Sequence, residues 1–394
     1  MNKAEPRLAM ALAERMRPKN TDYRQRLVEK ASQLEDVIVM GLGDPDASSP
    51  QHVVEAAQKA IIEGQTKYTH PAGMPELREA IAALLSKQYK LNYSSSEIIV
   101  TAGTQEAVML CMLALVDQGD EVLLPQPRFT SYDTAVEMLG GHVVPVPTFE
   151  ADGFALRPDE IAARITSRTK VLILVTPNNP TGAVTPPESI REIAKLCQDR
   201  DIVVISDEIY GSLLFDDAEH LSLASLPGMK ERTITLNGFS KSHAMTGWRI
   251  GYLAAPEQII QKLVEPRHTL SISASTPSQY AALAAATGPQ TAVDQIMETY
   301  VERRKILLPG LESLGFSYGT PAGAFYVYTN VSSTGMPATV FCERILEDAR
   351  VLVQPGMLFA DPDDRYVRFS LLQPKARIKE AIDRMQSALP NMIV

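Results

Sequence analysis

Short apolar runs alternate with amphipathic stretches through the middle of the chain, and this alternation limits the folds that the chain can adopt. The runs are rich in β-branched and aliphatic residues, and they occupy residues 97–100, 121–124, 142–146, 171–175, 202–205, 233–236 and 250–254. Several are apolar throughout, which is typical of strands buried on both faces. Strands that alternate with helices form a mostly parallel sheet covered on both sides. We therefore predict an α/β fold whose large domain, residues 45–285, holds a mostly parallel seven-stranded sheet between helices.

The last third of the chain has a different pattern. Helical stretches and strand-like runs follow one another there, the helices around residues 290–313, 337–349 and 375–389, the strands at 351–354 and 366–370. Helices beside a few strands predict a smaller α+β domain over residues 286–394. We expect the N-terminal segment, residues 1–44, to pack with this smaller domain.

Charge and composition exclude several classes of protein. The chain carries 38 Lys and Arg against 47 Asp and Glu, a formal net charge of −9, so its overall field does not attract nucleic acid. No apolar run is long enough for a membrane-spanning helix. The cysteines Cys111, Cys197 and Cys342 lie far apart, and the histidines lack metal-ligand spacing. We expect reduced thiols, no metal, no membrane partner and a cytoplasmic location.

Polar, turn-rich segments follow four of the predicted strands. They occupy residues 101–104, 177–182, 206–210 and 237–241. Ligands of open parallel sheets bind beyond the carboxyl ends of the strands. We therefore expect these four segments to form one site.

Lys241 is the first candidate for chemistry in that site. A lysine beside apolar strands can become a nucleophile that forms a Schiff base, provided that burial and neighbouring cations lower its pKa. Ser240 and Arg249 suit a phosphate-bearing aldehyde, because a hydroxyl and a planar cation both bind phosphate. For a lysine taken alone, a solvated loop position is the alternative.

Asp207 and the glycine turn at 103–104 are two further candidates. A buried carboxylate can keep a pyridinium nitrogen protonated, and the phenol of Tyr210 can hydrogen-bond a ring oxygen. Asp207 as the cap of a following helix is the alternative. Gly103 and Thr104 open a helical stretch, where free backbone N–H groups can bind phosphate.

These residues resemble the motifs of the class I/II aminotransferases, which are pyridoxal-phosphate enzymes of fold type I. The run Gly-Phe-Ser-Lys-Ser-His-Ala-Met-Thr-Gly-Trp-Arg-Ile-Gly at 238–251 is similar to the lysine signature of that family. Asn-Pro-Thr-Gly at 179–182 and Asp-Glu-Ile-Tyr at 207–210 are similar to two further motifs, in the expected order. The likeness covers essentially the whole chain and is greatest to the bacterial aspartate and aromatic aminotransferase branch.

The resemblance implies pyridoxal 5'-phosphate as the cofactor. It implies that Lys241 forms the Schiff base and moves the proton, and that Asp207 pairs with the pyridinium. Tyr210 and Asn179 would hydrogen-bond the phenolic oxygen of the ring. The other cofactor-binding residues that the resemblance implies are Gly103, Thr104, Ser240 and Arg249 at the phosphate, Phe129 stacked on the ring, and Tyr68 from a second subunit.

The resemblance also implies a substrate site and an assembly. Arg368 would bind the α-carboxylate of the substrate, with Asn179 and the backbone of Gly43. The implied enzyme is a homodimer with shared active sites that moves an amino group from an L-amino acid to a 2-oxo acid by a ping-pong mechanism.

Two other functions are compatible with such a fold. One is a lyase that eliminates a leaving group at Cβ, but carbon–sulfur lyases of this group often carry His where this chain has Tyr210. The other is a non-catalytic binding protein of aminotransferase-like fold, which would be expected to lack Lys241 or Asp207. Both residues are present, which favours an aminotransferase.

Two residues bear on the choice of amino donor. In the bacterial aspartate aminotransferase branch, a lysine often follows the phosphate-binding turn and contacts a second substrate carboxylate. This chain has the neutral Gln105 at that position, which predicts that dicarboxylic donors are not strongly preferred. Arg128 is the alternative cation if its side chain points inward, and a surface salt bridge is the other reading of that residue.

Overall fold

A seven-stranded sheet forms the centre of the computed structural model, which describes residue 13 and residues 22–392. Its strands are β2 (Ile98–Thr101), β3 (Glu121–Gln126), β4 (His142–Pro147), β5 (Thr169–Val175), β6 (Val203–Asp207), β7 (Thr233–Gly238) and β8 (Gly251–Ala254), in the order β2-β8-β7-β6-β5-β3-β4. Only β8 runs antiparallel to its neighbours, β2 and β7. The predicted α/β fold with a mostly parallel seven-stranded sheet is confirmed.

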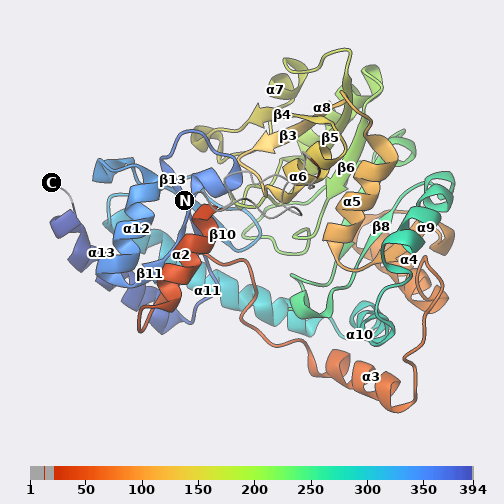
Figure 1. Ribbon diagram of the computed structural model, residues 1–394, viewed down its shortest axis with the longest axis horizontal. Helices are drawn as coiled ribbons and strands as arrows, with labels where there is room; N and C mark the ends of the chain where they lie inside the picture. The colour runs from red at the N-terminus through yellow and green to blue at the C-terminus, as the bar shows by residue number, and fades with distance from the viewer. Residues whose placement is uncertain (1–12, 14–21, 393–394) are drawn as a thin grey trace, which may run out of the picture.

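Alternate residues of the central strands bury themselves against helices on opposite faces of the sheet. In β5, Val171 and Ile173 pack with α5 (Thr104–Leu115), α6 (Ser131–Met138) and α9 (Glu257–Ser271). Leu172 and Leu174 pack on the other face with α7 (Pro158–Ala162) and α8 (Pro187–Asp199). This two-sided burial is the physical reason for strands that are apolar at every position. Beyond β2, helices α3 (Gln51–Ile62), α4 (Pro75–Tyr89) and α10 (Thr276–Thr287) form a further layer (Figure 1).

The last third of the chain forms a separate antiparallel sheet with its own helices. The strand order is β12-β13-β10-β9, from β9 (Ser317–Tyr318), β10 (Tyr326–Asn330), β12 (Gln354–Pro355) and β13 (Tyr366–Ser370). The accompanying helices are α11 (Thr291–Ser313), α12 (Ala338–Ala349) and α13 (Lys375–Met392). The strand expected over residues 351–354 is divided at Val353, because β11 (Val351–Leu352) pairs with β1 (Ile38–Val39) whereas β12 pairs with β13.

The described part of the N-terminal segment contacts this second sheet and its helices. Helix α2 (Asp22–Ser32) places Tyr23 and Leu27 against Leu346 and Leu352, and Figure 1 shows α2 beside α12. Residues 1–12 and 14–21 lie outside the described residues. The domain boundaries after residues 44 and 285 stay a prediction. Over residues 22–392, none of the helices combines the length and the apolar character that crossing a membrane requires.

Candidate active site

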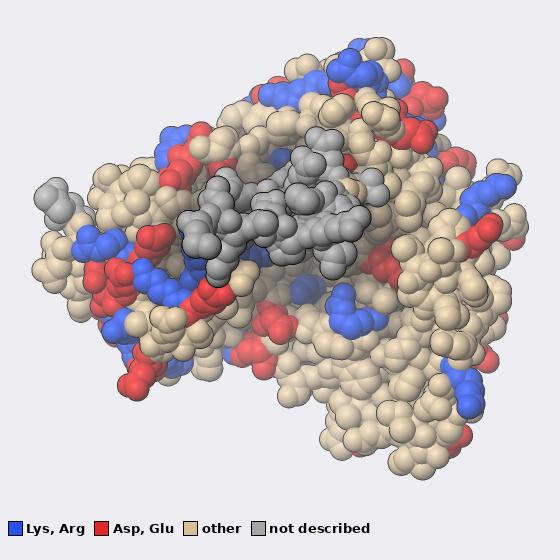
Figure 2. Space-filling model, in the orientation of Figure 1, with Lys and Arg blue, Asp and Glu red and all other residues tan. Residues whose placement is uncertain are grey.

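A cavity of about 410 Å³ lies at the carboxyl ends of the parallel strands. Ten of the predicted site residues line it: Gly43, Thr104, Phe129, Asn179, Asp207, Tyr210, Ser240, Lys241, Arg249 and Arg368. They come from both sheets, because Arg368 belongs to β13 and Asp207 ends β6. Figure 2 shows this face of the molecule hollowed between its two parts, with Lys or Arg side chains in the hollow.

Lys241 follows the end of β7 and points toward the N-terminal segment. Its Nζ donates a hydrogen bond to the carbonyl oxygen of Gly43, at 2.7 Å. Burial lowers the pKa of Lys241 to about 8, with Arg368 and Arg249 acting in the same direction and Asp44 opposing them. A pKa near 8 leaves a useful fraction of neutral amine at physiological pH, as a nucleophile needs. This environment contradicts the alternative of a solvated loop lysine.

Asp207 is a buried carboxylate without a cationic partner among residues 22–392. The hydroxyl of Tyr132 donates to its Oδ2 at 2.6 Å, and the backbone N–H of Ile209 donates to its Oδ1 at 3.1 Å. Burial raises the pKa of Asp207, although these two hydrogen bonds oppose the shift. No helix begins directly after β6, since the next one in the described chain starts at Leu223, so the alternative of a helix cap is wrong. A buried anion of this kind suits a ligand that brings a positive charge.

Tyr210 and Tyr326 form a buried pair of phenols beside Asp207. Their hydroxyl oxygens lie 3.0 Å apart, and burial raises the pKa of both groups. Tyr326 also packs closely against Gly43 at the cavity. A Cβ added to Gly43 would lie 2.3 Å from the hydroxyl oxygen of Tyr326. The pair therefore requires glycine at position 43.

The turn before α5 brings Gly103 against the side chain of Arg249. Gly103 has a positive φ of 79°, and a Cβ there would lie 2.6 Å from an Nη of Arg249. Arg249 also donates from Nη1 to the carbonyl oxygen of Thr246, at 2.9 Å. The guanidinium thus lies beside the free N–H groups at the start of α5, an arrangement that binds phosphate. Gly103 belongs to this turn but does not itself line the cavity.

Arg368 is held in place by hydrogen bonds and by two aromatic rings. Nη1 donates to Oδ1 of Asn179 at 2.8 Å, and Nη2 donates to the carbonyl oxygen of Gly41 at 2.5 Å. The rings of Tyr326 and Phe359 lie 4.4 and 4.5 Å from the guanidinium carbon. Its buried Nε has no hydrogen-bond partner among the described residues. A guanidinium fixed in this way at the cavity wall suits a carboxylate ligand.

Arg128 and Gln105 take different positions. Arg128 is buried and pairs with Asp133, with 2.9 Å between Nε and Oδ2, and it is not among the residues that line the cavity. The expected surface salt bridge is therefore a largely buried one, since the two side chains are only 7% and 20% exposed. Gln105, in contrast, lines the cavity.

Besides Gly103, one more predicted site residue, Tyr68, does not line the cavity, and the structure adds others that do. Tyr68 is 77% exposed and does not reach the cavity of its own chain. Tyr132 and Tyr326 were missed by the sequence analysis. For Tyr132 a signal existed, because β3 also ends at the same edge of the sheet and Tyr132 follows it. No local pattern marks Tyr326.

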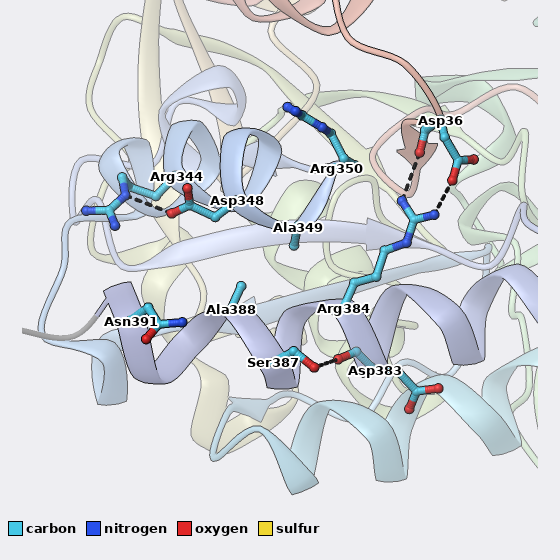
Figure 3. Close-up of a pocket in the computed structure, with 10 residues that line it drawn as sticks. All are labelled: Asp36, Arg344, Asp348, Ala349, Arg350, Asp383, Arg384, Ser387, Ala388 and Asn391. Atoms are coloured by element: carbon cyan, nitrogen blue, oxygen red, sulfur yellow. Dashed lines mark hydrogen bonds and ion pairs between the residues drawn. The ribbon is translucent and has the colours of Figure 1, made fainter.

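A second hollow lies between α12 and α13, away from all these residues. It measures about 820 Å³, and many of the side chains that line it are charged (Figure 3). Three of these are arginines, and two of the three already pair with a carboxylate. Arg384 binds Asp36, and Arg344 donates to Asp348 at 3.1 Å. Side chains that neutralise one another in this way offer little to an ionic ligand.

Comparisons with known proteins identify the family. The family model described as aminotransferase class I and II matches residues 35–385. The aspartate aminotransferase of Pyrococcus abyssi is 41% identical over 96% of this chain and 98% of that protein, and the aromatic-amino-acid aminotransferase 2 of Thermococcus litoralis is 38% identical over the same shares. Among solved structures, the aromatic aminotransferase of Pyrococcus horikoshii has a TM-score of 0.88 at 41% identity, covering 93% of this chain and 99% of its own. The aspartate aminotransferase of Thermus thermophilus with maleate has a TM-score of 0.90 at 38% identity, covering 96% and 99%.

The chain belongs to the class I and II aminotransferases. Its fold is that of the fold-type I members of the family. The donor set of the cavity suits their cofactor, because it combines a partly neutral lysine, a buried carboxylate that meets no cation among the described residues, and an arginine at a helix start. It is a pyridoxal-phosphate-dependent aminotransferase, which moves amino groups between amino acids and 2-oxo acids. Neither the lyase nor the non-catalytic alternative is favoured.

Proposed function

We propose that Lys241, Asp207 and Tyr210 are the catalytic residues of this transaminase. The observation that carries the proposal is the pairing, in one cavity, of a lysine with a pKa of about 8 and a buried carboxylate that lacks a cation among the described residues. When bound, pyridoxal phosphate supplies an electron sink that stabilises negative charge at the substrate Cα. Asp207 maintains that capacity by holding a positive charge at the ring nitrogen. Lys241 would accept the proton of the substrate Cα and would then donate it to C4′ of the cofactor.

The remaining residues hold and orient the two ligands. Arg249, Ser240, Thr104 and the backbone of Gly103 would bind the phosphate, and Phe129 would cover the ring. Tyr210 and Asn179 would hydrogen-bond the ring oxygen. Arg368 would bind the α-carboxylate of the substrate through its guanidinium group, assisted by Asn179 and by the backbone of Gly43. Rigid placement of these groups excludes unproductive orientations of the substrate.

We expect neutral and aromatic amino acids to compete well with aspartate as donors. Gln105 supplies only a neutral hydrogen bond, and Arg128 is engaged with Asp133. The measurement is kcat/KM for aspartate, phenylalanine, alanine and methionine, with Gln105→Lys as the test variant. The added cation should raise the relative preference for aspartate by about ten- to a hundredfold, since a charge-assisted hydrogen bond contributes about 1.5–3 kcal/mol. Arg128→Ala is the control and should leave the preference unchanged; a hundredfold wild-type preference for aspartate that this variant loses would contradict the proposal.

We propose that the active unit is a homodimer in which Tyr68 reaches the site of the partner. Exposed apolar side chains support this, since Tyr68 is 77% exposed, Ile62 85% and Leu270 50%. Their segments lie together in the fold, because Thr276 donates from Oγ1 to the carbonyl oxygen of Lys67, at 2.5 Å. Large exposed apolar side chains in one region are typical of an interface.

Light scattering at assay concentration should therefore give the mass of a dimer. Leu270→Glu places a charge in this interface, so it should shift the protein to monomers and lower activity by more than about tenfold. Val340→Glu, at an exposed apolar position on α12, is the matched control and should do neither. An active monomer in either the wild type or Leu270→Glu would count against the shared site.

We further propose a cytoplasmic location. The three cysteines are buried and unpaired, as is usual in a reducing compartment. Detection of the protein outside the cytoplasmic fraction of its cells would argue otherwise.

A further inference from the structure

Arg267 is a fully buried cation that the proposed reaction leaves without a role. It lies on α9, and its Nε, Nη1 and Nη2 atoms have no hydrogen-bond partner among the described residues. Its one ion pair within residues 22–392 joins Nη2 to Oε2 of Glu106, at 3.7 Å. Burial lowers the pKa of Arg267, and the charge of Glu106 opposes that shift. Because a buried charge destabilises a fold unless an opposite charge compensates it, Arg267 requires the Glu106 carboxylate.

Glu106 connects α9 to the turn that precedes α5. It lies in the first turn of α5, and its Oε2 accepts a hydrogen bond from the backbone N–H of Ala102, at 2.5 Å. Its Oε1 accepts a hydrogen bond from the hydroxyl of Ser271, the last residue of α9. The Glu106 side chain is only 11% exposed, so solvent screens these contacts weakly. The carboxylate therefore fixes the backbone at residue 102 relative to α9.

The turn divides its backbone N–H groups between this cluster and a ligand. Ala102 donates to Glu106, and Gly103 donates to the carbonyl oxygen of Thr101, at 2.9 Å. No described side chain caps α5, so the first N–H groups of the helix remain for the cofactor phosphate. The Glu106 carboxylate and the phosphate would thus be two anions at one helix N-terminus.

A carboxylate beside a phosphate weakens the binding of that phosphate unless a cation compensates it. The positive end of α5 favours both anions, but in partly buried surroundings their mutual repulsion is also strong. Arg267 supplies the compensating charge, because it pairs with Glu106 and does not line the cavity. Arg249, which does line the cavity, serves the phosphate itself.

We propose that Glu106 and Arg267 are positioning residues for the cofactor phosphate. Glu106 fixes the turn at Ala102, and Arg267 neutralises the carboxylate so that a phosphate dianion can bind at the same helix start. Neither residue touches the cofactor in this scheme, since neither lines the cavity. The inference rests on the proposed function, because it requires the phosphate at the start of α5.

Arg267→Met is the first test, because methionine keeps an unbranched side chain and removes the charge. Equilibrium dialysis of the full chain against pyridoxal phosphate should show an affinity about ten- to a hundredfold below that of the wild type, since like charges placed side by side are costly. The affinity for pyridoxal, which lacks the phosphate, should change less than about threefold. Lys262→Met removes a cation from an exposed position of the same helix, so it should leave both affinities unchanged.

The double variant Glu106→Gln/Arg267→Met separates compensation of charge from packing. It buries no charge, and the amide oxygen of glutamine can still accept the hydrogen bond from Ala102. Its affinity for pyridoxal phosphate should therefore lie within about threefold of the wild type, although both charged groups are gone. This comparison also decides the matter if Arg267→Met alone does not fold, because the double variant lacks the uncompensated carboxylate.

Several results would overturn the positioning role. These are a double variant that binds pyridoxal phosphate tenfold or more below the wild type, an unchanged affinity in Arg267→Met, and equal losses for pyridoxal phosphate and pyridoxal. The proposed function fails in a different way, because an unchanged affinity for pyridoxal phosphate in Arg249→Ala would show that the phosphate does not bind at the start of α5.

Discussion

Replacing Lys241 with alanine is expected to lower kcat for transamination by several orders of magnitude. The change removes the nucleophile and the proton-transferring base at once, and no other lysine lines the cavity in the described part of the chain. The purified wild-type protein should be yellow, and borohydride should fix its cofactor to the chain. Lys241→Ala should bind pyridoxal phosphate reversibly, without a covalent product after reduction.

Lys262→Ala is the matched control, because Lys262 is an exposed residue of α9. It should retain wild-type activity and wild-type thermal stability. Turnover within tenfold of wild type in Lys241→Ala would disprove the assignment, as would a wild-type protein that takes up no pyridoxal phosphate.

Replacing Asp207 with alanine should lower kcat by about two to four orders of magnitude, with a smaller effect on cofactor affinity. A buried charge partner contributes about 3–5 kcal/mol, and each 1.36 kcal/mol is about a tenfold change in rate. Arg249→Ala should have the opposite profile, because Arg249 lies at the proposed phosphate site and does not contact Asp207. It should weaken cofactor retention while leaving the rate of the fully loaded enzyme closer to wild type.

Tyr132→Phe separates the charge of Asp207 from its hydrogen bond. The variant removes the 2.6 Å bond to Oδ2 but keeps the carboxylate, so its loss of kcat should be much smaller than that of Asp207→Ala. Cofactor titrations and saturating kinetics on the three variants make the comparison. Equal effects of Asp207→Ala and Arg249→Ala on both properties would refute the division of roles.

The large sheet and the position of its ligand site were predictable from the sequence. Apolar runs such as 171–175 indicate strands buried on both faces, and β5 indeed packs on two layers of helices. Parallel strands also place their carboxyl ends on one edge, so Asp207 and Lys241 could be expected in one site although β6 and β7 are separate strands. These inferences succeed because periodicity and strand direction are local properties of the chain.

The sequence alone therefore determined the class of fold and named candidate residues for the chemistry, whereas the tertiary structure decided which of them touch. Tyr326 meets Tyr210 across 116 positions of the chain, and Arg368 meets Asn179 across 189. The direction of Arg128 toward Asp133 likewise depends on how the connection between β3 and α6 packs rather than on residue type. The contacts of Tyr326 and Arg368 leave no local pattern, because each joins a residue of the small sheet to a residue that follows a strand of the large sheet.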